Sequence, residues 1–176
     1  MRDHEPLIDE LLGRFRQEIG ADLEKYTNHV HRVFETCVMR DTDPANRHKY
    51  AIAAVFHDIG IWTAHTVDYL PPSMEQAEHY LNTTQGGAGT AEITAMIYWH
   101  HKVRPYRGAF RVTVETFRKA DWTDVSLGLL TFGADPRMLR RLRRKFPNAG
   151  FHWFLIRKIG ANFLRHPLNP LPMFKS

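Results

Sequence analysis

The segment AIAAVFHDIGIW, residues 51–62, joins an apolar run to an adjacent histidine and aspartate, His57 and Asp58. The run predicts a buried helix over about 46–58 that ends near Gly60. Because both polar side chains follow an apolar run, they are expected to point toward the core. A buried carboxylate is costly unless a cation or strong hydrogen-bond donors compensate it. The segment therefore predicts a helical core beside a polar site in which a cation or hydrogen-bond donors offset the buried carboxylate.

Apolar residues recur at helical spacing along the rest of the chain, and no alternating strand pattern or hairpin dipeptide occurs. Ser73 with Gln76 resembles a capping box, Thr90 is a candidate cap, and Asp135 before Pro136 is typical of a helix start. Helices are expected over about 7–19, 22–40, 73–81, 90–101, 112–132, 137–146 and 151–165, with the extended proline-rich tail HPLNPLPMFKS after them. We predict an all-α fold in a single domain spanning residues 1–176.

The amino-acid composition excludes several classes of protein. A chain of 176 residues with 43% hydrophobic residues can build one sizeable core. The single cysteine, Cys37, excludes an intramolecular disulfide framework and a multi-cysteine zinc module. The sequence has no signal-peptide pattern and no apolar run long enough to cross a bilayer. We expect a cytoplasmic protein with no membrane span, and the oligomeric state is open.

Charge is unevenly distributed along the chain. Residues 1–135 hold 14 basic and 19 acidic side chains, whereas residues 136–176 hold 10 basic side chains and no acidic one. Such a basic segment suits phosphates, nucleic acid or an anionic membrane face, although it is more often a solvated helix face. Nucleic acid is the weakly supported partner, because only Phe146 interleaves the arginines of the predicted basic helix.

Two further polar residues lie in apolar helical contexts like that of His57 and Asp58. His29 lies on the apolar face of the predicted 22–40 helix, and Asp121 lies within the predicted 112–132 helix. Two imidazoles and two carboxylates suit one divalent metal ion, compatible with Mn, Mg, Co, Fe, Ni or Zn. Taken alone, each residue also fits a hydrogen-bonded core histidine or a capping aspartate. The pattern by itself leaves both readings open.

Four motifs occur in a recognisable order: NHVHRV (28–33), FHDIG (56–60), IYWHH (97–101) and KADWTD (119–124). Their order resembles the HD-domain superfamily of metal-dependent phosphohydrolases, over about residues 26–125. The resemblance implies an all-helical bundle with an HD-like core over about 22–132 and a basic helical extension over about 135–176.

The resemblance also assigns metal ligands residue by residue. It selects His29 rather than His31, and Asp121 rather than Asp124, and it adds the doublet itself. The implied ligands are His29, His57, Asp58 and Asp121.

The chain departs from the family pattern at two positions. Ser73 stands where members with two metals carry an additional histidine, so the resemblance implies one metal ion. Ile61 stands where several nucleotide-hydrolysing members carry a glutamate. The general acid is therefore open between His100, His65 and a metal-bound water. We expect the neighbouring His101 to face elsewhere.

The resemblance implies a hydrolase that acts on a nucleotide or another small phosphate ester by metal-activated water. The expected catalytic residues are Asp58, which accepts a proton from the attacking water, and His100, which protonates the leaving oxygen. Basic residues beside the motifs are expected to bind the phosphate: Arg32, Lys102, Arg104 and Arg107. The alternatives are a hydratase or lyase on the same scaffold, and a non-catalytic metal- or nucleotide-binding module that docks through its basic helix.

Overall fold

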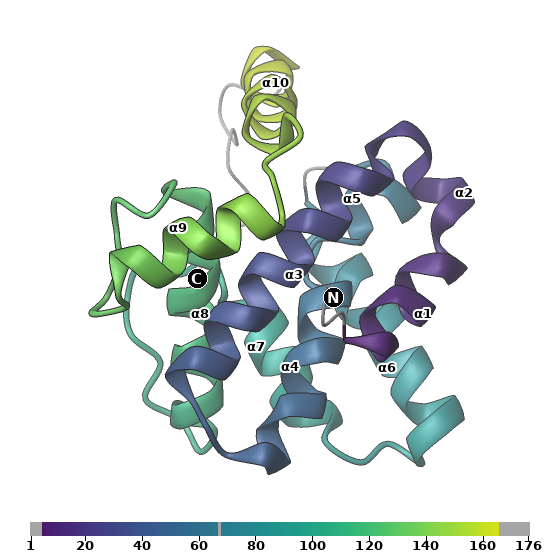
Figure 1. Ribbon diagram of the computed structural model, residues 1–176. Helices are drawn as coiled ribbons and strands as arrows, with labels where there is room; N and C mark the ends of the chain where they lie inside the picture. The colour runs from purple at the N-terminus through teal and green to yellow at the C-terminus, as the bar shows by residue number, and fades with distance from the viewer. Residues whose placement is uncertain (1–4, 67, 166–176) are drawn as a thin grey trace.

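The computed structural model describes residues 5–66 and 68–165, and the regular structure within them is entirely helical. The all-α prediction is confirmed. Figure 1 shows the helices in chain order: α1 (Pro6–Arg14), α2 (Arg16–Ile19), the short 3-10 helix η1 (Gly20–Asp22), α3 (Leu23–Arg40), α4 (Pro44–Phe56), α5 (Gly60–Thr63), α6 (Leu70–Gln85), α7 (Thr90–Trp99), α8 (Arg111–Val125), α9 (Pro136–Lys145) and α10 (Phe151–Arg165).

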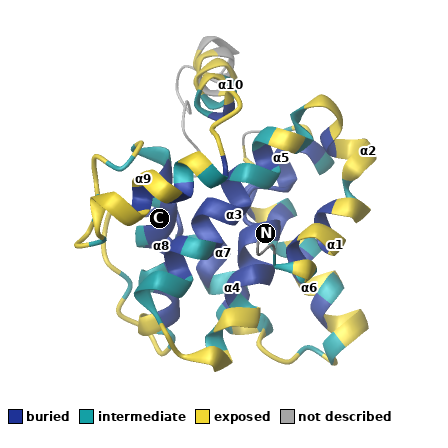
Figure 2. Cartoon of the chain, in the orientation of Figure 1, coloured by how far each residue is buried: buried dark blue, intermediate teal, exposed yellow. Residues whose placement is uncertain are grey.

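The centre of the bundle is formed by α3, α4, α7 and α8. Every residue of 50–56 on α4 is buried, as the apolar run predicts, and α4 packs against α1, α3, α6 and α7. The helix α3 packs against α8 on its other side. Figure 2 shows that the buried residues concentrate in these central helices, whereas α2 and α10 are largely exposed. The helices that carry the polar motifs therefore form the core.

The turn between α4 and α5 carries the His57–Asp58 doublet. The helix α4 ends at Phe56, two residues before the predicted end. Gly60 begins α5, and its N–H donates a hydrogen bond of 2.9 Å to Ser73 Oγ. A Cβ at position 60 would lie 2.4 Å from the Tyr69 carbonyl oxygen. Position 60 therefore requires glycine, because α6 passes too close for any side chain.

We expect Gly60→Ala to lower the free energy of unfolding by about 1–3 kcal/mol, the usual effect of overpacking a tight site. The clash is with backbone, which cannot rotate away. Urea unfolding of Gly60→Ala measures the effect, with Gly13→Ala as the control, because a Cβ at position 13 meets nothing within 4 Å. Equal stability of the two variants would contradict this packing argument.

Several predicted helix boundaries are wrong. Ser73 does not cap a helix, because α6 already begins at Leu70 and the Ser73 hydroxyl accepts from Gly60 instead. Thr90 is the first residue of α7, after the N-cap Gly89. The predicted 112–132 helix ends at Val125.

The predicted start of the basic helix is confirmed. Asp135 caps α9 by accepting a hydrogen bond of 2.8 Å from the Arg137 N–H. The predicted tail, residues 166–176, lies outside the described residues. Among the residues that are described, no helix is both long and apolar enough to cross a membrane.

Candidate metal centre

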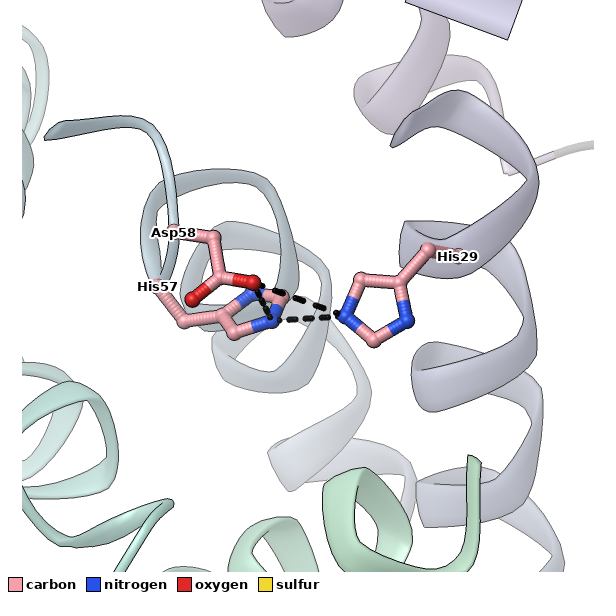
Figure 3. A group of neighbouring side chains, drawn as sticks. All are labelled: His29, His57 and Asp58. Carbon is pink, nitrogen blue, oxygen red and sulfur yellow. Dashed lines mark hydrogen bonds and ion pairs between the residues drawn. The ribbon is translucent and has the colours of Figure 1, made fainter. Parts of the chain in front are cut away.

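Four predicted ligands meet at one buried place, which we call the His/Asp cluster: His29 on α3, His57 and Asp58 in the turn after α4, and Asp121 on α8. The Nε2 atoms of His29 and His57 lie 3.0 Å apart. Asp58 Oδ2 lies 3.8 Å from His29 Nε2 and 3.4 Å from His57 Nε2. Asp121 Oδ1 lies 3.5 Å and 3.8 Å from the same two nitrogens. Figure 3 shows the first three side chains facing one another.

The imidazole rings are held with one nitrogen free to ligate. His57 Nδ1 donates to the Ala54 carbonyl at 2.7 Å, and His29 Nδ1 donates to Asp124 Oδ2 at 2.7 Å. A neutral imidazole carries one proton, so each Nε2 presents a lone pair. Two lone pairs 3.0 Å apart repel unless a cation, either a proton or a metal ion, lies between them. This orientation by the second nitrogen is common among metal-binding histidines.

The spacing of the ligand atoms fits one metal ion. Atoms that bind an ion at about 2.1 Å lie about 3.0–4.2 Å from one another. Each of the two histidine Nε2 atoms lies 3.0–3.8 Å from the other and from a carboxylate oxygen of Asp58 and of Asp121. Asp58 Oδ1 and both carboxylate oxygens of Asp121 are buried and have no hydrogen-bond partner. Buried acceptors without donors are rare in proteins, and a divalent cation would satisfy them.

The two carboxyl groups of the cluster titrate differently. Burial raises the pKa of Asp121 to about 7, and the nearby charge of Asp58 adds to the rise. Burial also opposes ionisation of Asp58, but the imidazoles of His57 and His100, which are protonated in the acidic range where Asp58 titrates, hold its pKa below the ordinary value. Burial lowers the pKa of His57 to about 3, which keeps this ring neutral at physiological pH. A neutral imidazole beside an ionised carboxylate is the form that ligates a metal.

His100 and His101 extend the cluster toward α6. His100 Nε2 lies 3.4 Å from Asp58 Oδ1, while His100 Nδ1 donates to the Ile97 carbonyl at 2.6 Å. His101 Nδ1 lies 3.6 Å from Asp121 Oδ2, and the Tyr69 hydroxyl contacts His101 Nε2. The expectation that His101 faces elsewhere is therefore wrong. Asp58, His100 and His101 form a second group of side chains that could hold a metal ion.

Asp124 holds the His29 ring and is itself held by Arg32. The Arg32 guanidinium donates to Asp124 from Nε at 2.6 Å and from Nη2 at 2.9 Å, and its Nη1 donates to the Phe146 and Pro147 carbonyls. Although burial opposes it, the hydrogen bonds from His29 and Arg32 hold the pKa of Asp124 below its ordinary value. Arg32 is buried and its guanidinium is bound to Asp124 and to two carbonyls, so we do not propose it as a phosphate-binding residue.

The other predicted phosphate-binding residues lie in the segment between α7 and α8. The Lys102 ammonium lies 4.5 Å from the centroid of the Tyr98 ring, and Arg104 is exposed. Arg107 lines an open cleft of about 1090 Å³, and the described residues that line it include none of the cluster. His65, one candidate for the general acid, is exposed in the loop before α6. Arg104 and Arg107 thus lie at the surface, whereas the predicted metal ligands lie together in the core.

The first turn of α10 covers the cluster on the side of His29. The Phe151 ring stacks on the His29 ring with 4.1 Å between centroids, and Phe154 stacks on Trp62 at 5.4 Å. His152 Nε2 donates to the Asp124 and Val125 carbonyls at 3.1 Å. The sequence does not predict these contacts, because nothing in the local pattern indicates which surface a C-terminal helix will meet.

No known protein-family model matches the chain, and no match was found among curated proteins or among solved structures. The fold and the site alone therefore define its class. The protein is an all-α bundle with a buried His/Asp cluster that could hold a metal ion.

Proposed function

We propose that the protein is a metal-dependent phosphohydrolase acting on a nucleotide or another small phosphate ester. The observation that carries the proposal is the convergence of His29, His57, Asp58 and Asp121, in which each histidine Nε2 lies 3.0–3.8 Å from the other and from both carboxylates. The resemblance of the four motifs to the HD-domain superfamily supports it. In this proposal the four side chains hold one divalent ion, which polarises a phosphate and makes a bound water more acidic.

The residues around the ion have distinct roles in the proposed reaction. Asp58 would bind the metal ion through Oδ2, which faces His57 Nε2. Its Oδ1, which has no hydrogen-bond partner, accepts the proton of the attacking water. His100 donates a proton to the leaving oxygen. Burial opposes protonation of His100, but the nearby carboxylates of Asp58 and Asp121 raise its pKa, as a general acid requires. Asp124 keeps His29 in position.

A structural metal site is the second candidate. All four residues of the His/Asp cluster are buried, and Phe151 covers the His29 ring. A metal with no open coordination position would stabilise the bundle without turning over a substrate. The two proposals share a ligand set and differ in whether hydrolysis is observed.

We expect one equivalent of divalent metal per chain after reconstitution, together with metal-dependent release of phosphate from at least one member of a nucleotide and phosphomonoester panel. Elemental analysis and a phosphate assay measure these two quantities. His57→Gln should abolish both, whereas the control His48→Gln should abolish neither, because His48 is exposed and bonds to Gln85. Stoichiometric metal without turnover would favour the structural site, and absence of metal would reject both proposals.

A further inference from the structure

The helix α10 has an exposed apolar face in addition to the face that packs on the bundle. Trp153, Ile156 and Phe163 are 66%, 58% and 56% exposed, and their spacing places them on one side of the helix. Phe151 and Phe154 point the other way and pack against the bundle. In Figures 1 and 2, α10 lies outside the packed helices and most of its described surface is exposed. The outer face is apolar but is not part of the core.

The surroundings of this apolar face are basic. The described helices α9 and α10 contain no acidic residue, and Arg157 is exposed beside the apolar face, whereas Lys158 lies on the opposite side, with its ammonium over the Phe154 ring. Four exposed arginines of α9 have no acidic partner among the described residues: Arg137, Arg140, Arg141 and Arg144. Arg143 differs, because it donates to the Leu127 and Thr123 carbonyls. An occupant of the outer face must therefore tolerate strong positive charge.

Charge and apolarity together select one occupant. A second copy of the chain would bring two acid-free basic segments together, and the like charges would repel. Nucleic acid would satisfy the arginines but would leave Ile156 without an apolar environment. An anionic bilayer surface offers both phosphate groups for the basic side chains and an apolar layer for tryptophan, isoleucine and phenylalanine.

We propose that the outer face of α10, assisted by the arginines of α9, docks the protein on anionic phospholipid surfaces. The apolar face defined by Trp153, Ile156 and Phe163 enters the interface, while Arg157 contacts the headgroups. The proposal is independent of the metal and of hydrolysis, because none of these side chains belongs to the His/Asp cluster.

Co-sedimentation of the metal-free full chain with vesicles tests the proposal. We expect binding to vesicles of equimolar phosphatidylglycerol and phosphatidylcholine, little binding to phosphatidylcholine alone, and weaker binding as salt is raised. The double variant Trp153→Ser/Ile156→Ser should bind at least about tenfold more weakly, since two apolar side chains no longer enter the interface. Arg157→Gln should also weaken binding, by roughly fivefold.

Leu129→Ser is the matched control, because Leu129 is 86% exposed but lies in the loop before α9. It should bind vesicles like the wild type, and circular dichroism should show equal helicity in every variant compared. Failure to bind phosphatidylglycerol vesicles, or equal loss in Leu129→Ser, would overturn the proposal. So would a dimer that dissociates in Trp153→Ser/Ile156→Ser, or tight oligonucleotide binding without vesicle binding, since these outcomes assign the face to another partner.

Discussion

Asp121→Asn is expected to abolish metal binding and metal-dependent hydrolysis while leaving the metal-free protein folded. The substitution keeps the size of the side chain but removes one anionic ligand from a buried set in which neither Asp121 oxygen has a hydrogen-bond partner. Elemental analysis should show less than one tenth of an equivalent, as a rough bound for loss of one of four ligands. Asp68→Asn, which changes an exposed aspartate before α6, should retain the metal.

Although Asp121→Asn is expected to lose the metal, we expect it to stabilise the metal-free protein at alkaline pH. In the metal-free protein burial raises the pKa of Asp121 to about 7, from an ordinary value of 3.8. The folded state therefore holds this proton more tightly than the unfolded state, and the free energy of unfolding falls as pH rises through that interval. At about pH 8 the cost of the buried charge reaches at most about 4 kcal/mol, whereas near pH 4 it is small.

Asparagine carries no charge, so metal-free Asp121→Asn should be more stable than the wild type at about pH 8 and similar to it near pH 4. Urea unfolding with a chelator present at the two pH values measures the difference. A variant that keeps its metal and activity would remove Asp121 from the site. A variant destabilised equally at both pH values would show that the carboxylate serves packing rather than metal binding.

The sequence sufficed for the all-α class and for the burial of the candidate ligands, because both depend on local pattern. An apolar periodicity predicts a buried helix face, and a histidine or aspartate on that face then has to be compensated in the core. His29 and Asp121 meet this criterion on α3 and α8. Their proximity follows from the packing of those two helices, which the family resemblance implied and periodicity alone did not.

The contacts that the sequence did not predict are made with partners distant in the sequence. Arg32 looks like a phosphate ligand beside His29, but its partner is Asp124, 92 residues away. His101 follows the end of α7, where the helical rule for side-chain direction no longer applies, so its contact with Asp121 could not be read from spacing. Phe151 reaches His29 through the docking of α10. Local patterns indicate burial and charge but not which partner provides them.

Arg32→Met is expected to lower the free energy of unfolding of the metal-free protein by about 3–5 kcal/mol, the usual cost of breaking a buried ion pair from one side. The Asp124 carboxylate is nearly inaccessible to water and would keep only its hydrogen bond from His29. The carbonyls of Phe146 and Pro147, which join α9 to α10, would also lose their donor. Urea unfolding in the presence of a chelator measures the loss.

Two companion variants separate the ion pair from general effects of removing an arginine. Arg14→Met breaks an exposed pair with Glu10 on α1 and should cost no more than about 1 kcal/mol. The double variant Arg32→Met/Asp124→Asn should recover part of the stability lost in Arg32→Met, because it no longer buries an unpaired charge. Both Arg32 variants should bind metal roughly 10–100-fold more weakly, since His29 loses the support of the pair. If Arg32→Met is no less stable than Arg14→Met, the Arg32–Asp124 pair contributes little to the fold. If the metal affinity of the Arg32 variants is unchanged, the pair does not position His29.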